Sequence, residues 1–160
     1  MDVRIDCEEG HFKFRVSGVL KYKDKFLFVK MNQNNFYCMP GGHVELGEDT
    51  RQAVLREMEE ELGFKVKIDR FLGETQNFFY GKDGKTWHEL GYYYVVEAEN
   101  ESDINEEDYV REENDKGFIQ HLEFRWLTID EAEKIVFRPD FLLDLLKASE
   151  PQHLICDYRK

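Results

Sequence analysis

Cysteine and proline are scarce in this chain, with three residues of each among 160. Cys7, Cys38 and Cys156 are odd in number and far apart, and no pair has the C-x-x-C spacing of a zinc site. We expect free thiols in a reducing compartment rather than a structural disulfide. Repeats and low-complexity linkers are also absent, which favours a single domain over residues 1–160.

Long apolar runs and basic clusters are missing as well. No apolar stretch approaches the roughly 18 residues that span a bilayer, and residues 1–6 lack the apolar core of a signal peptide. We therefore expect a cytoplasmic protein that does not enter membranes. The net charge is −12 with no Lys/Arg-rich run, which disfavours binding to DNA. Bound divalent cations would still let an acidic site accept phosphate.

The apolar pattern predicts a mixture of strands and helices. Strands are expected at residues 12–20, 25–30, 36–39, 65–72, 75–80, 88–97 and 118–127, the first two as a hairpin and the third stopped by Pro40-Gly41-Gly42. Helices are expected at residues 50–62, ending at Gly63, at 129–136 after a Thr128 capping box, and at 139–147 with Pro139 in the first turn. Residues 32–35 and the acidic run 100–116 are expected to be solvated loops. The pattern predicts an α/β fold whose sheet is covered by helices on both faces.

The helix expected at 50–62 carries a group of carboxylates. Its period places Glu57, Glu60 and Glu61 on one face. Like charges at this spacing repel one another, and Arg56, spaced to pair with Glu60, cannot neutralise all three. A hard divalent cation such as Mg²⁺ or Mn²⁺ would do so. The helix by itself is better explained as a solvated Glu-rich surface, but the preceding Pro40-Gly41-Gly42 segment, which can bring backbone close to a ligand, favours the metal site.

This segment resembles the Nudix signature G-x5-E-x7-R-E-U-x-E-E-x-G-U, in which U is a bulky apolar residue. Every fixed position is matched, by Gly42, Glu48, Arg56, Glu57, Met58, Glu60, Glu61, Gly63 and Phe64. The resemblance implies a Nudix-type α/β/α sandwich with a mixed central sheet. It also implies a pyrophosphohydrolase that uses Mg²⁺ or Mn²⁺ to cleave a phosphoanhydride bond in nucleoside diphosphate-linked compounds.

The resemblance also implies residue roles. The metal ligands would be Glu57, Glu60, Glu61 and the carbonyl of Gly42, with Glu57 either a ligand or the general base. Arg56 would orient these glutamates through a salt bridge. Glu48 would support the junction between the loop and the helix.

Many relatives recruit a further carboxylate from a later strand or loop, as a ligand or as the base. Glu123 is the candidate by resemblance, although its alternation with Leu122 and Phe124 fits an outward-facing strand residue equally well. Glu89 and the Glu112-Glu113 pair are weaker candidates.

Substrate recognition lies outside the signature. Phe79 and Tyr80 are candidates for stacking on a nucleobase, although aromatic residues in strands are more often core. A tyrosine at the place of Tyr80 typifies diadenosine polyphosphate hydrolases, whereas a proline typifies many ADP-ribose pyrophosphatases. We expect nucleoside triphosphates, including oxidised ones, or dinucleoside polyphosphates as substrates. An ADP-ribose or nucleotide-sugar pyrophosphatase and a non-catalytic nucleotide-sensing module are the alternatives, and a homodimer stays open.

Overall fold

A computed structural model describes residues 1–32, 34–115 and 117–160. Gln33, within the loop expected at 32–35, and Lys116, at the end of the expected acidic loop, lie outside the described residues. The strands are β1 (Arg4–Asp6), β2 (Gly10–Tyr22), β3 (Lys25–Met31), β4 (Tyr37–Cys38), β5 (Gly41–His43), β6 (Val66–Tyr80), β7 (Thr86–Ala98), β8 (Tyr109–Asp115), β9 (Phe118–Leu127), β10 (Phe137–Arg138) and β11 (Gln152–Asp157). The helices are α1 (Thr50–Leu62), a short 3-10 turn (Glu101–Asp103), α2 (Ile129–Ala132) and α3 (Leu142–Lys147).

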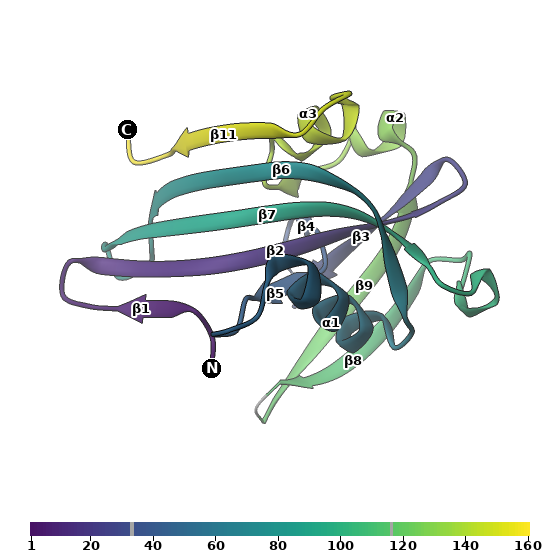
Figure 1. Ribbon diagram of the computed structural model, residues 1–160, viewed down its shortest axis with the longest axis horizontal. Helices are drawn as coiled ribbons and strands as arrows, with labels where there is room; N and C mark the ends of the chain where they lie inside the picture. The colour runs from purple at the N-terminus through teal and green to yellow at the C-terminus, as the bar shows by residue number, and fades with distance from the viewer. Residues whose placement is uncertain (33, 116) are drawn as a thin grey trace.

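The strands form one mixed sheet whose main path runs β10-β4-β3-β2-β7-β6-β11. The β2–β7, β6–β11 and β4–β10 pairs are parallel, whereas β2–β3, β6–β7 and β8–β9 are antiparallel. Alternate residues of β2 enter different cores: Val16 and Leu20 pack with α1, and Val19 packs with α3. Helix α1 therefore lies on one face, and α2 and α3 lie on the other (Figure 1). This arrangement confirms the expected α/β/α sandwich with a mixed central sheet.

Helix α1 has the bounds that the sequence predicts. The Asp49 side chain accepts hydrogen bonds from the backbone of Arg51 and Gln52, and Gln52 completes the capping box. Gly63 ends the helix in the left-handed conformation, with φ of 82°. Met58 is fully buried over Gly18, where a Cβ would lie 2.4 Å from the Met58 sulfur. The absence of a side chain on β2 at this point lets α1 approach the sheet closely.

The predicted hairpin of β2 and β3 is present, and β9 has the predicted bounds. The two strands expected at 65–72 and 75–80 are in fact one strand, β6. Its register against β7 shifts between Ile68 and Arg70 and again between Phe71 and Gly73. These irregularities interrupt the alternation of side chains, which explains why the sequence pattern looked like two strands.

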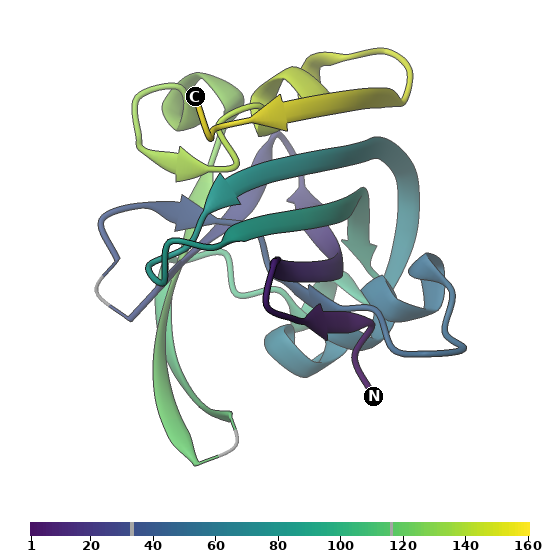
Figure 2. The ribbon, with the colours of Figure 1, turned by 90° about the vertical axis from the view of Figure 1, so that its left-hand side faces the viewer.

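The prediction of a loop through residues 100–116 is wrong for its second half, where β8 pairs with β9. Tyr109 of β8 stacks on Phe124 of β9, with ring centroids 4.6 Å apart. The charged residues of β8 are accommodated because the strand lies at an edge and pairs on one side only. Figure 2 shows the β8–β9 hairpin extending away from the rest of the fold.

Three expectations for the last third of the chain need correction. The Thr128 capping box is present as predicted. Helix α2, however, ends at Ala132 and not at residue 136. The last helix begins at Leu142 rather than at Pro139, because residues 137–138 form β10 and pair with β4. Strand β11 was not predicted, since its residues show no apolar run. No helix in the described part of the chain has both the length and the apolar character to cross a bilayer.

Candidate active site

The Pro40-Gly41-Gly42 segment does not simply end a strand, because β5 begins at Gly41 and pairs with β2. Gly18 N–H donates to Pro40 O, and Val44 N–H donates to Phe14 O, each at 3.0 Å. Even-numbered residues of this segment therefore direct their backbone groups toward β2, and odd-numbered residues direct theirs toward the free edge. The Gly42 carbonyl thus points toward β2, and the Gly41 carbonyl lies on the free edge of β5, where it accepts a hydrogen bond from Arg15 Nη2 at 3.3 Å.

Arg56 connects the segment around β5 with the first signature glutamate. Its Nε and Nη2 donate to the two carboxylate oxygens of Glu48 at 2.8 and 2.9 Å. Nη2 also donates to the carbonyl of His43 on the free edge of β5, at 3.0 Å. The Arg56 guanidinium holds the pKa of Glu48 below its usual value. Glu48 therefore stays ionised and locks the loop to the helix, as the resemblance implied.

Glu57 is held by the same arginine. Arg56 Nη1 donates to Glu57 Oε1 at 2.7 Å and lies 3.7 Å from Glu60 Oε1. The Glu57 carboxylate rests against Gly42, where a Cβ would come within 2.2 Å of Oε2. Burial raises the pKa of Glu57, and Arg56 counteracts part of that rise. Gly42 thus provides the space in which this carboxylate lies.

Glu61 lies deeper, at the edge of β5. Its Oε1 accepts a hydrogen bond from Gly41 N–H at 3.2 Å. Burial raises the pKa of Glu61 to about 8, and the negative charges of Glu113 and Glu57 raise it further, against the hydrogen bond from Gly41. A carboxylate in this position would be stabilised by a nearby cation.

Glu60 is the exposed member of the group, with 58% of its side chain accessible, against 15% for Glu57. The C-terminal end of the helix has no basic residue of its own in the last turn. Arg111 of β8 takes that place, donating to the carbonyls of Glu61 and Glu60. This cation at the negative end of the helix dipole offsets part of the repulsion between the glutamates.

These residues suit a hard divalent cation in their chemistry. Glu57, Glu60, Glu61 and the Gly41 carbonyl all offer oxygen, and Glu61 is half-buried with a backbone N–H as its hydrogen-bond donor. Within the described ranges, however, no three His, Cys, Asp or Glu side chains are gathered closely enough to hold an ion. Arg56 instead pairs with two of the three carboxylates, those of Glu57 and Glu60.

The structure does not bring Glu123 to this group. Its side chain is 55% exposed and lies 4.0 Å from Lys30, while the neighbouring Leu122 and Phe124 enter the core beside α1. Glu113 is the later carboxylate whose charge acts on Glu61. Glu113 was only a weak candidate by sequence, because residues 100–116 were expected to form a loop. Tyr109, Arg111 and Glu113 occupy every second position and would share one face of a strand. This spacing was the signal that could have identified Glu113.

The candidate substrate residues lie at the far end of β6. Phe79 stands opposite Trp87 of β7, with nearly parallel rings and centroids 6.1 Å apart. Tyr80 is exposed at the end of the strand. Both residues line a surface pocket of about 520 Å³, together with Lys13 and Trp87. The structure therefore places them together, but not beside the glutamates.

Comparison with known proteins identifies the family of this chain. A model described as the NUDIX domain matches residues 12–145. An ADP-ribose pyrophosphatase of Methanocaldococcus jannaschii is 38% identical over 66 residues, covering 39% of this chain and 39% of that protein. The chain spans less than half the length of the curated relatives that it matches.

Solved structures share the fold. The mutator protein MutT from Bacillus halodurans has a TM-score of 0.65 at 18% identity, covering 92% of this chain and 90% of that chain. The C. elegans Ap4A hydrolase has a TM-score of 0.57 at 22% identity, covering 85% of this chain and 94% of that chain. With the family match over most of the sequence and the signature residues arranged around α1 and β5, the chain belongs to the Nudix family.

Proposed function

We propose that the protein is a pyrophosphohydrolase that cleaves a phosphoanhydride bond in a nucleoside diphosphate-linked compound with the help of Mg²⁺ or Mn²⁺. The observation that carries the proposal is the set of three glutamates on α1 beside the free edge of β5, with Glu61 hydrogen-bonded to the backbone of Gly41. Nudix enzymes generally use divalent metals, and the oxygen donors of this site suit them.

In this proposal Glu57, Glu60 and Glu61 hold the cation, and the Gly41 carbonyl takes the part that the resemblance gave to Gly42. A bound divalent cation supplies charge neutralisation for the diphosphate and acidifies the attacking water. Arg56 keeps Glu57 in place through its 2.7 Å hydrogen bond.

Glu123 has no part in the proposed site, because its side chain lies among exposed residues beside Lys30. Glu113 takes its place as the additional carboxylate. It comes from β8, a later strand, and its charge acts on Glu61. Removing this charge would lower the pKa of Glu61 and thereby alter the affinity of the site for the cation.

The proposed substrates are nucleoside triphosphates, including oxidised ones, or dinucleoside polyphosphates. Tyr80 at the end of β6 favours them over ADP-ribose, by resemblance to diadenosine polyphosphate hydrolases. The relative from Methanocaldococcus jannaschii, which is named for ADP-ribose, keeps an ADP-ribose or nucleotide-sugar substrate as the second candidate.

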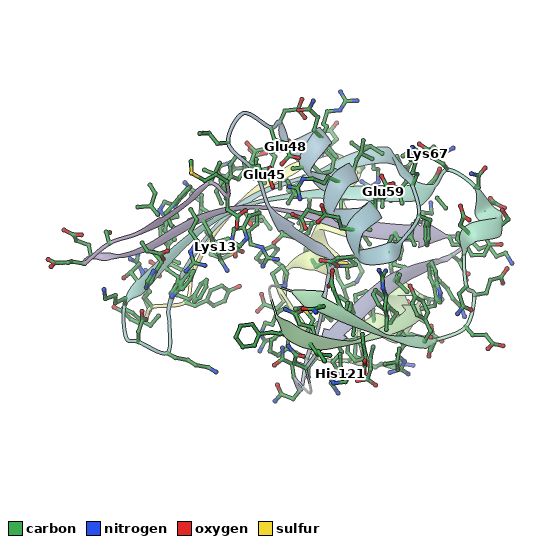
Figure 3. The ribbon with its side chains drawn as sticks, turned by 90° about the horizontal axis from the view of Figure 1, so that it is seen from below. Lys13, Glu45, Glu48, Glu59, Lys67 and His121 are labelled. Carbon is green, nitrogen blue, oxygen red and sulfur yellow. The ribbon has the colours of Figure 1, made fainter. Side chains whose placement is uncertain are left out.

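The test is a turnover screen with Mg²⁺ and with Mn²⁺. The panel contains nucleoside triphosphates, 8-oxo nucleotides, dinucleoside polyphosphates, ADP-ribose and nucleotide sugars. Glu60→Gln and Glu61→Gln should each keep the fold and lose most turnover. Glu59→Gln is the matched control, because Glu59 is an exposed glutamate on the same helix that matches no fixed position of the signature (Figure 3).

Unimpaired turnover in both signature variants would refute the proposed site. A folded wild-type protein that cleaves nothing on the panel would refute the proposed substrates. Nucleotide affinity without turnover would favour the non-catalytic sensing module.

A further inference from the structure

Three neighbouring strands carry a block of polar side chains on the face opposite α1. Lys13 of β2, Glu89 of β7 and Asn77 of β6 stand opposite one another in register. Residues opposed in this way share a face of the sheet. Arg15 belongs to the next row, nearer to β5, and this row has Gly91 at its centre. Figure 3 shows Lys13 on the long strands, away from Glu48 and Glu59 at α1.

The hydrogen bonds within this block are incomplete. Asn77 Nδ2 donates to Glu89 Oε1 at 3.0 Å, and Lys13 Nζ lies 2.8 Å from Glu89 Oε2. Asn77 is only 5% exposed, yet its Oδ1 is buried without a hydrogen-bond partner among the described residues. The Nε of Arg15 is also buried without a hydrogen-bond partner within the described ranges. The Nε2 atoms of His43 and His88 are also unpaired in the part of the chain that the structure describes. Buried polar atoms are nearly always paired, so those of Asn77 and Arg15 are available to bind a ligand.

The two atoms differ in what they require. Arg15 Nε is a donor and needs an acceptor, such as a phosphate or a base oxygen. Asn77 Nδ2 faces a carboxylate, which only accepts, so Oδ1 is the free acceptor and needs an N–H or O–H donor. A bare diphosphate offers acceptors alone when ionised. A nucleoside offers both, through its base amines and its sugar hydroxyls.

The block lies within reach of the glutamates. Arg15 Nη2 donates to Gly41 O at 3.3 Å, and Gly41 N–H donates to Glu61. From β2 to β6 are two strand spacings, roughly 10 Å, which is the scale of one nucleoside. Gly91 is the central residue of the row that contains Arg15. A Cβ at Gly91 would lie 3.1 Å from the Thr75 hydroxyl, so the row has no room for a larger residue there.

The charges in the block also suit such a ligand. The cations of Lys13 and Arg15 outnumber the single carboxylate of Glu89, within a chain of net charge −12. Burial opposes ionisation of Glu89, but Lys13 and Arg15 hold its pKa below the usual value. Glu89 is therefore a fixed acceptor, and the block attracts an anionic ligand at its β5 end.

We propose that Arg15, Asn77 and Glu89 form the site for the nucleoside part of the substrate, with Arg15 Nε donating to the ligand and Asn77 Oδ1 accepting from it. This inference rests on the proposed function, because it assigns the substrate specificity of the same site. It makes Asn77 a specificity-determining residue that binds substrate and takes no part in the chemical step, whereas Arg15 also contacts the Gly41 carbonyl of the proposed cation site.

The experiment measures the affinity of the full chain, with Mg²⁺, for α,β-methylene ATP and α,β-methylene GTP, and for methylenediphosphonate, which lacks a nucleoside. Asn77→Leu removes the amide at nearly constant volume. It should weaken binding of the better-bound nucleotide analogue about tenfold or more, and change diphosphonate binding less than about twofold. Gln76→Leu is its control, because Gln76 is the neighbouring residue on the other face of β6.

Arg15→Met tests the donor independently, in case Asn77→Leu does not fold. It should also weaken nucleotide binding about tenfold, whereas the exposed Arg125→Met should not. With a substrate that is turned over, Asn77→Leu should raise KM and leave kcat within about threefold, whereas Arg15→Met also removes the contact with the Gly41 carbonyl and should change both.

The outcomes separate this inference from the proposed function. Wild-type turnover together with unchanged affinity in both variants overturns the inference alone. Nucleotide binding that the variants weaken, without any turnover, overturns the proposed function and supports the binding site. A wild-type protein that binds neither nucleotide analogue overturns the inference.

Discussion

Arg56 holds Glu48 with two parallel hydrogen bonds, from Nε and Nη2, at 2.8 and 2.9 Å. The pair joins the middle of α1 to the loop that precedes it. The same guanidinium reaches Glu57 and the carbonyl of His43, so one side chain fixes the loop, the helix and a signature carboxylate together. Such two-pronged contacts combine strength with a defined orientation.

Replacing Arg56 by lysine should therefore reduce both stability and turnover, although the positive charge is kept. Lysine has one ammonium group and cannot contact Glu48, Glu57 and His43 O at once. We expect Arg56→Lys to lose roughly 2 kcal/mol of unfolding free energy in urea titrations and at least tenfold in turnover. Arg125→Lys, at an exposed pair 3.9 Å from Asp108, should change neither value measurably. Wild-type stability and turnover in Arg56→Lys would contradict this account.

Gly42→Ala should affect the site more than the fold. The new Cβ would displace the Glu57 carboxylate, which is the flexible end of its side chain. We expect the unfolding free energy to stay within about 1 kcal/mol and the affinity for Mn²⁺ to fall about tenfold or more. A double-mutant cycle provides the check, because Gly42→Ala should have little further effect on Mn²⁺ affinity in a Glu57→Ala background. Equal effects in both backgrounds would show that Glu57 is not what the methyl group displaces.

The raised pKa of Glu61, about 8, predicts a pH dependence of the metal-free protein. The unfolded chain releases this proton near the ordinary value of 4.5, whereas the folded protein keeps it until about pH 8. The folded state binds more protons in this window, so stability should fall as the pH rises from about 4.5 to 8. Urea titrations in EDTA should show a shallower fall for Glu61→Gln than for the wild type.

Addition of Mg²⁺ at pH 8 should restore stability to the wild-type protein and not to Glu61→Gln. Glu59→Gln serves as the control and should behave as the wild type. Parallel pH profiles for the wild type and Glu61→Gln would contradict the assignment of a buried, proton-retaining carboxyl group.

His11 should titrate above its ordinary value. Its ring is hydrogen-bonded to Asp6 and Asp83. The ring also stacks on Trp87, and the two ring centroids are 4.4 Å apart. The hydrogen bond to Asp6, followed by that to Asp83, raises the His11 pKa above 6.5. The contribution of this charged cluster to stability is therefore complete below pH 6.5 and is lost as the pH rises through the folded-state pKa. An NMR titration should give a pKa above 6.5, which Asp83→Asn lowers; a wild-type value at or below 6.5 would contradict the arrangement.

The features that the sequence predicted well depend on short-range contacts. Helix α1 has the predicted bounds because its cap at Asp49 and its stop at Gly63 involve residues within a few positions of each other. The hairpin of β2 and β3 was predictable for the same reason. Strand β8 was missed because its stability comes from pairing with β9 and from the stacking of Tyr109 on Phe124, which its acidic composition conceals.

The sequence by itself determined the family signature, the glutamate face of α1 and the α/β/α class, because helical period and capping act locally along the chain. Only the tertiary structure decided which residues join that face. Pairing of β5 with β2 leaves the Gly41 carbonyl, and not that of Gly42, on the free edge of β5. The register of β2, β7 and β6 gathers Arg15, Asn77 and Glu89, which are up to 74 positions apart in the sequence. Strand register is set by long-range pairing, and no short stretch of this chain specifies it.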